Sequence, residues 1–160
     1  MNTVTTSTAN PPRLIILMGI PAAGKTTFYT RMFAPQGIRH INLDTLRKRH
    51  REMLLVQQYI SERVSFAVDN TNTLPLERER YIIPATTAGY RIEGYLLRSC
   101  VADSIRDNAA RERHVPVHAI QDMFDRLVLP RYAEGFHELY YVKRRIGGYD
   151  ITPWIEFPKS

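Results

Sequence analysis

Apolar and polar residues follow one another along this chain in blocks that predict strands and helices in turn. An apolar run at residues 14–18 stops at Gly19 and predicts a buried strand. From Phe28 to Phe33 the apolar positions recur at helical spacing, which predicts an amphipathic helix. The same criteria predict further strands at residues 38–43, 64–68, 90–97 and 136–142, and further helices at residues 45–63, 73–88, 101–113 and 117–129.

Strands that alternate with helices predict an α/β fold, with a parallel sheet of five strands and helices on both of its faces. We expect a single domain over residues 13–160, because a chain of 160 residues suffices for one hydrophobic core. Residues 1–12 are rich in Thr, Ser, Asn and Pro and predict a flexible leader. After Gly147-Gly148 a short extended piece is expected around residues 151–157.

Three charged side chains, Lys25, Asp44 and Asp69, fall just past the ends of predicted strands. Sheets of this kind bind their ligands at the carboxyl ends of the strands. We therefore expect these three side chains to lie near one site.

The junction of the first strand and the first helix carries the phosphate-loop (Walker A) pattern G-x-x-x-x-G-K-S/T. Gly19 and Gly24 allow the backbone to curl and bring its N–H groups close to a polyphosphate. Lys25 supplies a mobile cation for the terminal phosphates, and the Thr26 hydroxyl can bind Mg²⁺. The alternative is an ordinary strand-to-helix turn, but the pattern arises by chance in only about one chain of this length in two hundred. The candidates for ATP binding in this loop are Gly19, Ile20, Pro21, Ala22, Ala23, Gly24, Lys25, Thr26 and Thr27.

Asp44 and Arg47 stand three positions apart at the start of the second predicted helix. One interpretation is structural, with Asp44 as the helix N-cap and Arg47 as a surface arginine. The other is catalytic. Asp44 would accept the proton of an acceptor hydroxyl, and Arg47 would face the same way and hold an acceptor phosphate or carboxylate. The two are compatible, because a capping position would fix the carboxylate.

The third predicted strand is followed by Asp69-Asn70-Thr71-Asn72. A tight Asx-type turn between the strand and the next helix accounts for such a sequence. An acidic residue at this place can also hold Mg²⁺, directly or through water. Thr26 and Asp69 are therefore the candidate metal ligands.

The chain is basic, with a net charge of +6 and a pI of about 9.7, which favours polyanionic partners. The charge is concentrated at residues 47–51 and 106–114, although such clusters are commonly solvated helix faces. No apolar run approaches the length of a membrane span, and we expect no membrane partner. The single cysteine, Cys100, excludes an internal disulfide and favours a reducing, cytoplasmic environment.

Six segments spread over nearly the whole chain carry a family resemblance: residues 19–28, 41–47, 68–72, 108–111, 115–116 and 134–136. Together, and in this order, they resemble the polynucleotide kinase-like branch of P-loop kinases.

The resemblance implies an ATP-dependent kinase with a five-stranded parallel sheet and a short helical lid. It implies that Asp44 is the general base for a 5′-hydroxyl group and that Arg47 engages the phosphate of the acceptor. Asp69 would lie near the metal and the acceptor, and Asn72 would belong to the acceptor site.

The resemblance also assigns cations to the lid. Arg111, with Arg106 as a further candidate, would neutralise charge on the transferred phosphoryl group. Members of the family often carry an arginine directly before the lid asparagine, whereas Asp107 precedes Asn108 in this chain.

We therefore expect an ATP- and Mg²⁺-dependent kinase that acts on the 5′-hydroxyl of RNA or DNA, as in nucleic acid repair. A fused phosphatase or ligase domain would not fit in 160 residues, so a repair partner is expected to be a separate chain. Two alternatives share the ATP-binding residues. One is a kinase of a small-molecule hydroxyl, in a sugar, nucleoside or antibiotic. The other is a nucleotide-binding module without phosphoryl transfer, which the presence of both Lys25 and Asp44 disfavours.

Overall fold

The computed structural model describes residues 9–156. Residues 1–8, which belong to the expected leader, and residues 157–160 lie outside the described part. The strands are β1 (Arg13–Met18), β2 (Arg39–Ile41), β3 (Phe66–Asp69), β4 (Arg91–Leu97), β5 (Glu138–Arg145) and β6 (Gly148–Pro153). The α-helices are α1 (Lys25–Met32), α2 (Leu43–Leu46), α3 (Arg49–Glu62), α4 (Pro75–Thr87), α5 (Val101–Ala109) and α6 (Val117–Arg126), and two 3₁₀ helices are η1 (Ala34–Gln36) and η2 (Tyr132–Glu134). None of the helices in this part of the chain is both long enough and apolar enough to cross a membrane.

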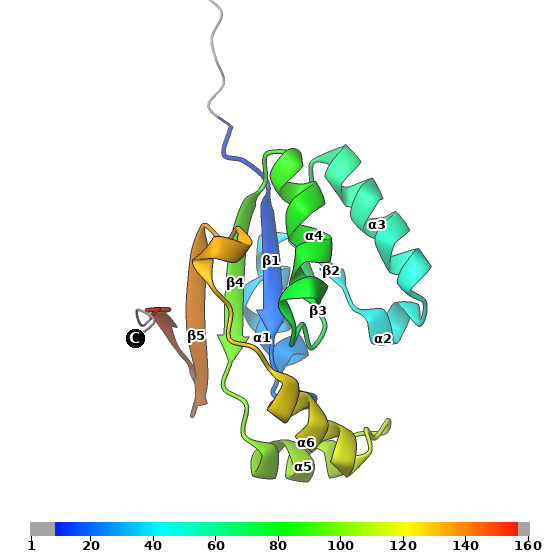
Figure 1. The fold of residues 1–160 in the computed structure, drawn as a ribbon, viewed down its shortest axis with the longest axis vertical. Coiled ribbons are helices and arrows are strands. Elements are labelled where there is room, and N and C mark those ends of the chain that lie inside the picture. Colours follow the sequence, from blue (N-terminus) through cyan, green and yellow to red (C-terminus); the bar gives the residue numbers. More distant parts are fainter. Residues whose placement is uncertain (1–8, 157–160) are drawn as a thin grey trace, which may run out of the picture.

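The six strands form one sheet in the order β2-β3-β1-β4-β5-β6 (Figure 1). The first five strands run parallel, and β6 runs antiparallel to β5. β1 lies in the interior of the sheet, where Leu14 is opposite Phe66 of β3 on one side and Ile92 of β4 on the other. A parallel strand in this position is covered on both faces, which explains why β1 is an uninterrupted apolar run.

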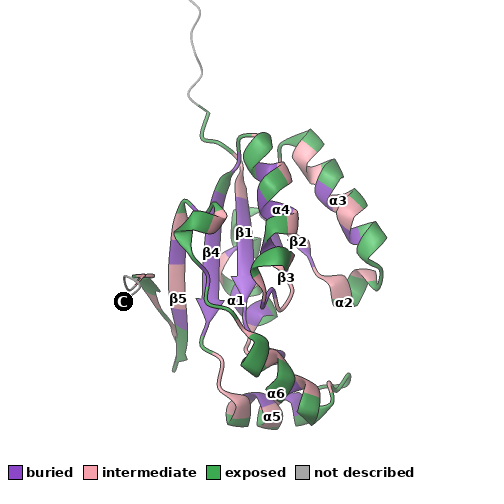
Figure 2. Cartoon of the chain, in the orientation of Figure 1, coloured by how far each residue is buried: buried purple, intermediate pink, exposed green. Residues whose placement is uncertain are grey.

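Alternate residues of β1 face two different layers of helices. Leu14 belongs to an apolar cluster that includes Val56 of α3 and Tyr81 of α4. Ile15, the next residue, belongs to a second cluster that includes Phe28 of α1. The alternation follows from the two-residue period of a strand. Figure 2 shows the central strands buried and the outer faces of the helices exposed. The predicted α/β fold, with helices on both faces of the sheet, is confirmed.

The sheet has one strand more than the sequence predicts. Gly147, with a φ of 78°, closes a tight turn after β5, and the chain returns along β5 as β6. The reversal uses a left-handed backbone conformation that glycine adopts without steric cost. The five predicted parallel strands are all present, and the expected extended piece after Gly148 adds a sixth, antiparallel strand at the edge of the sheet.

The single helix predicted over residues 45–63 is divided in two. α2 ends at Leu46, and Arg47 follows it as a C-cap with a φ of 62°. α3 begins only at Arg49. A residue in the left-handed region cannot continue a right-handed helix. Arg47 therefore does not extend the helical face on which Asp44 lies.

α5 and α6 lie beyond the carboxyl ends of the parallel strands, below the arrowheads in Figure 1. α5 ends at Ala109, before the predicted boundary, and Arg111 lies in the connection to α6. The side chain of Asn108 closes this connection, because it donates to the carbonyl of Val115 at 2.7 Å and accepts from the Val115 amide at 2.9 Å. The two helices lie where the resemblance implies a short helical lid.

Candidate active site

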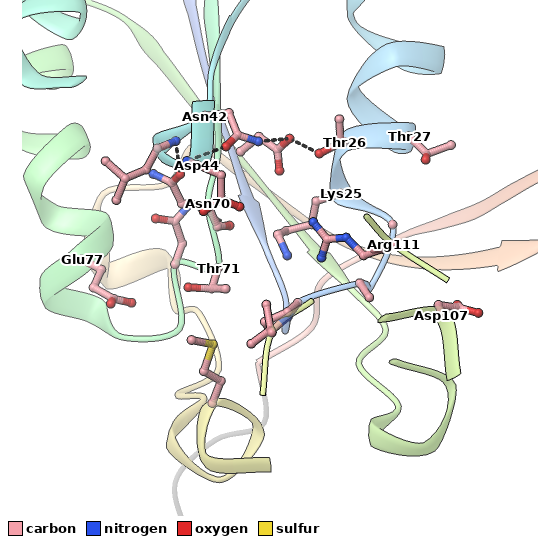
Figure 3. Close-up of a pocket in the computed structure, with 18 of the residues that line it drawn as sticks. Lys25, Thr26, Thr27, Asn42, Asp44, Asn70, Thr71, Glu77, Asp107 and Arg111 are labelled. Carbon is pink, nitrogen blue, oxygen red and sulfur yellow. Dashed lines mark hydrogen bonds between the residues drawn. The ribbon is translucent and has the colours of Figure 1, made fainter. Parts of the chain in front are cut away.

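A cavity of about 530 Å³ opens where β1 and β3 end, between the phosphate loop and the helices around it (Figure 3). Lys25, Asp44 and Asp69 all line this cavity. Of the nine loop candidates, six line it and three, Gly19, Ile20 and Ala23, do not. The complete wall consists of Pro21, Ala22, Gly24, Lys25, Thr26, Thr27, Asn42, Leu43, Asp44, Arg49, Asp69, Asn70, Thr71, Asn72, Glu77, Arg80, Asp107, Arg111, Val115, Met123 and Arg144.

The phosphate loop curls between β1 and α1 as its sequence predicts. Gly24 adopts a φ of 92° directly before α1, and the amide of Gly19 donates to the carbonyl of Thr71 at 3.0 Å. The Lys25 ammonium donates to the carbonyls of Gly19 and Ile20, each at 2.9 Å. The lysine thus lies buried against its own loop, at the start of a helix whose dipole favours an anion.

Burial lowers the pKa of Lys25 to about 8. The negative charges of Asp69 and Asp44 act in the opposite direction, and the positive charge of Arg111 adds to the lowering. All three neighbours come from other parts of the chain, so the sequence gives no direct sign of this shift. The lysine is therefore poised to lose its charge at mildly alkaline pH, and an anion in the loop would favour the charged form.

We predict that the affinity for ATP falls as the pH rises above about 8. Below that pH the Lys25 ammonium is charged and attracts the phosphates, whereas above it the charge is lost unless ATP binding takes up a proton. The affinity should fall by at most about tenfold per pH unit. Calorimetric titrations with ATP, in buffers of different ionisation enthalpy, measure both the affinity and the proton uptake. Lys25→Arg keeps its charge throughout this range, so the same pH dependence in that variant would contradict the prediction.

Asp69 at the end of β3 is the centre of a polar cluster. Its Oδ2 accepts from the Thr26 hydroxyl at 2.6 Å and from Asn42 Nδ2 at 3.3 Å, and it lies 2.9 Å from His40 Nε2. Burial alone would raise the pKa of this carboxyl, but the hydrogen bonds from His40 and Thr26, together with the Lys25 charge, outweigh burial, and the net pKa is lowered. Asp69 is therefore a carboxylate at neutral pH.

Thr26 and Asp69 fit a magnesium site of the kind found next to bound phosphates. Both supply oxygen atoms, which Mg²⁺ prefers, and such sites commonly use one or two protein oxygens together with water and substrate phosphates. Within residues 9–156 the hydrogen bonds to the Asp69 carboxylate all reach Oδ2, which leaves Oδ1 for another partner. Thr26 and Asp69 are the residues that would hold the ion.

Asp44 is not the N-cap of its helix. Asn42 takes that position, and its Oδ1 accepts from the Asp44 amide at 2.8 Å. The capping alternative for Asp44 is therefore wrong, because the neighbouring asparagine already satisfies the free amide. No described residue forms a hydrogen bond or ion pair with the Asp44 carboxylate, which is exposed in the cavity wall. Figure 3 shows Asp44 across the cavity from Lys25.

A buried cluster behind α2 holds Asp44 in this position. Asn70 accepts from the Leu43 amide at 2.9 Å, so the first turn of α2 is tied to the end of β3. Asn70 in turn donates to Glu52 of α3 at 2.8 Å and to the Tyr81 hydroxyl at 3.0 Å. Glu52 is fully buried and also accepts from Tyr81 at 2.6 Å. A network in which each buried group is paired holds a single geometry.

Asn72 lies in the cavity wall, but its side-chain amide forms hydrogen bonds within the protein. Its φ is 47°, and its Nδ2 donates to the carbonyl of Leu17 at 2.8 Å. Its carbonyl accepts from the fully buried Arg78 at 3.0 Å. Asn72 thus fixes the path of the chain from β3 to α4 beside the phosphate loop.

The three predicted arginines are placed differently. Arg111 lines the cavity and lies next to Lys25 in Figure 3. Arg106 is 70% exposed, lies 3.3 Å from Asp103 and 3.5 Å from Asp107, and does not line the cavity. Arg47 is exposed and is also absent from the cavity wall.

Three further arginines line the cavity that were not singled out as site residues from the sequence, although Arg49 belongs to the basic cluster at residues 47–51. Arg49 is the first residue of α3, Arg80 lies in α4, and Arg144 lies in β5. Nη1 of Arg80 is buried and finds no hydrogen-bond partner within residues 9–156. The only signal for Arg80 is its spacing of three from Glu77, which puts both on one face of α4. Nothing in the sequence points to Arg144.

A protein-family profile described as "AAA domain" (AAA_33) matches residues 14–130. The protein named "Bifunctional polynucleotide phosphatase/kinase" of Schizosaccharomyces pombe is 24% identical over 128 residues, which are 77% of this chain and 31% of that protein. The "Putative bifunctional polynucleotide phosphatase/kinase" of Acanthamoeba polyphaga mimivirus is 24% identical over 136 residues, 79% of this chain and 32% of that protein. The chain thus spans about a third of the length of these curated relatives.

Solved structures share the fold at low sequence identity. Kti12 of Chaetomium thermophilum, in complex with ADP-AlF3, superposes with a TM-score of 0.66 at 16% identity, over 81% of this chain and 88% of that one. A gluconokinase from Sinorhizobium meliloti superposes with a TM-score of 0.59 at 16% identity, over 84% of each chain. The chain belongs to the AAA domain family AAA_33, and it is a P-loop kinase-like domain whose fold implies nucleotide binding.

Proposed function

We propose that the chain is a kinase that transfers the γ-phosphoryl group of ATP to the 5′-hydroxyl of RNA or DNA. The observation that carries this proposal is the Asp44 carboxylate, which has no partner among the described residues and lines the same cavity as Lys25 and Thr26. A carboxylate opposite a phosphate loop can accept the proton of an attacking hydroxyl. The names of the two curated relatives support a polynucleotide as the acceptor.

In this proposal some residues of the cavity bind the phosphate donor and others bind the acceptor. Lys25 and Arg111 bring positive charge to the end of the triphosphate, where negative charge accumulates in the transition state. Thr26 and Asp69 would hold Mg²⁺, which supplies further neutralisation of the phosphate oxygens when bound. Asp44 orients the acceptor hydroxyl and takes its proton. Transfer is direct, because positioning and charge suffice for this chemistry without a covalent intermediate.

The acceptor side of the cavity is suited to an anion. Arg49 and Arg80 line it from α3 and α4. Nη1 of Arg49 is already bonded to Glu52 and to the Tyr81 hydroxyl, whereas the buried Nη1 of Arg80 is a hydrogen-bond donor without a described acceptor. A phosphate of the acceptor strand would provide one. Arg47 lies outside the cavity wall, and we propose that it meets the acceptor chain where a polynucleotide extends beyond the cavity. Asn72 shapes the wall near the acceptor.

We also propose a cytoplasmic location. Cys100 is the only cysteine of the sequence and is a free thiol, as is usual for proteins of reducing compartments.

The test is a transfer assay with γ-labelled ATP and Mg²⁺. The acceptors are DNA and RNA oligonucleotides with a 5′-hydroxyl, the same oligonucleotides with a 5′-phosphate as matched controls, and a set of sugars and nucleosides. The proposal predicts label at the 5′ end of the hydroxyl oligonucleotides only. Label on small alcohols alone would show a small-molecule kinase instead. ATP binding without any labelled acceptor would show a nucleotide-binding module.

A further inference from the structure

One cation beside the phosphate loop belongs to no motif in the sequence. Arg144 lies near the end of β5, and its side chain reaches the loop that follows β1. A methyl group placed on Gly24 would lie 3.6 Å from Arg144 Nη1. The same arginine lines both the main cavity and a smaller one of about 100 Å³ next to it.

Arg144 is held there by the lid helix. Its Nη2 lies 3.2 Å from Oδ2 of Asp107 in α5, and Asp107 lines the same two cavities. No described residue accepts a hydrogen bond from Nη1 or Nε of Arg144, so the guanidinium keeps donors for another partner. The arginine is 54% exposed, and an exposed ion pair of this kind contributes little to stability. The pair therefore does little to hold the fold together, but it fixes where the guanidinium lies.

The neighbouring positions of α5 do not supply this charge. Arg106 is 70% exposed, lies 3.3 Å from Asp103 and 3.5 Å from Oδ1 of Asp107, and does not line the cavity. Asp107, which follows it, faces the cavity as an acid. Its two oxygens pair with different arginines, Oδ1 with Arg106 outside the cavity and Oδ2 with Arg144, and only the guanidinium of Arg144 lies at the phosphate loop.

We propose that Arg144 binds the phosphates of the nucleotide donor, with Asp107 as the residue that positions its guanidinium over the phosphate loop. The resemblance gives Arg106 of the lid as a further candidate beside Arg111, and in this proposal the additional cation comes from β5 instead. This inference rests on the proposed function only in taking the cavity as the site of ATP. A guanidinium suits the role because it can bond to a phosphate through two N–H groups while a third stays with the carboxylate.

The next residue of the strand offers a matched control. Arg145 points away from the site, where its Nη1 lies 3.3 Å from Asp150 of β6. It is 64% exposed and lines neither cavity. Removing either arginine takes one positive charge from the same strand, so a difference between the two variants reports position and not net charge.

The experiment measures ATP affinity by calorimetry, and the Michaelis constants for ATP and for the acceptor, in Arg144→Ala and Arg145→Ala. Arg144→Ala should weaken ATP binding by about tenfold or more, as expected for a lost charge-assisted hydrogen bond, and should leave the acceptor constant unchanged. Arg145→Ala should behave as the unaltered protein. Thermal unfolding of each variant shows whether the fold is retained. ATP binding by Arg144→Ala equal to that of Arg145→Ala would overturn the proposal.

A second variant moves the positive charge to another position instead of only removing a side chain. Asp107→Arg, combined with Arg144→Ala, places a guanidinium on the lid helix beside the same loop. The double variant should regain ATP affinity relative to Arg144→Ala, and a further loss would contradict the proposal. If the unaltered protein labels the acceptor but Arg144→Ala does not change ATP affinity, this inference is refuted and the proposed function is not. If Arg144→Ala weakens ATP binding but the unaltered protein labels no acceptor, the proposed function is refuted and this inference is not.

Discussion

Asp44→Asn is expected to lower the rate of phosphoryl transfer by about 100- to 10,000-fold while ATP binding remains nearly unchanged. The amide cannot accept the proton of the acceptor hydroxyl, but it has the same shape as the carboxylate. The fold should be retained, because the bond that anchors this residue runs from its backbone amide to Asn42 and not from its side chain. Single-turnover transfer to a 5′-hydroxyl oligonucleotide measures the rate, and calorimetry with ATP measures the binding.

The control for this variant is Asp150→Asn. Asp150 lies on β6, is paired with Arg145 and does not line the cavity, so the substitution removes the same charge outside the site. It should leave the transfer rate as it is in the unaltered protein. A rate in Asp44→Asn that matches this control would remove Asp44 from the mechanism.

Lys25→Met is expected to lower kcat/KM for ATP by about 100- to 1,000-fold or more, through both weaker binding and slower transfer. The ammonium is the buried cation of the phosphate loop, and its bonds to the carbonyls of Gly19 and Ile20 show how deeply it reaches into the loop. Methionine has a similar length and flexibility but carries no charge. Steady-state kinetics over a range of ATP concentrations, together with calorimetry, separates the two effects.

The contrast between the two variants is itself informative. Lys25→Met should impair ATP binding, whereas Asp44→Asn should not, because one residue serves the donor and the other the acceptor. Lys25→Arg retains the charge with a different geometry and should fall between methionine and lysine. Normal ATP affinity in Lys25→Met would contradict the assignment of this loop as the phosphate site.

The part of the site that the sequence predicts is the part encoded by neighbouring residues. The strand, the loop and the helix from Leu14 to Phe33 follow one another in the chain, and each has its own local signal. The convergence of Lys25, Asp44 and Asp69 was also predictable, because the carboxyl ends of parallel strands meet at one edge. Both predictions depend on rules that need no knowledge of long-range packing.

The part that the sequence misses depends on packing between distant segments. Arg144 is separated from the loop by most of the chain, and only the position of β5 in the sheet brings it to Gly24. The break at Arg47 is a backbone conformation that a non-glycine residue adopts at a cost, and no periodicity signals it. Asn42 and Asn70 follow two different strands, so their joint hold on α2 appears only once those strands are paired.

The proposed function requires that one cavity holds the γ-phosphoryl group between the acceptor hydroxyl, which attacks it, and the β-phosphate oxygen of ADP, which leaves. A crystal structure with a non-hydrolysable ATP analogue, Mg²⁺ and a 5′-hydroxyl oligonucleotide tests it most directly. We expect the γ-phosphate at Lys25 and the terminal hydroxyl within hydrogen-bonding distance of Asp44. An oligonucleotide bound elsewhere, with Asp44 out of reach of its 5′ end, would refute the proposed function.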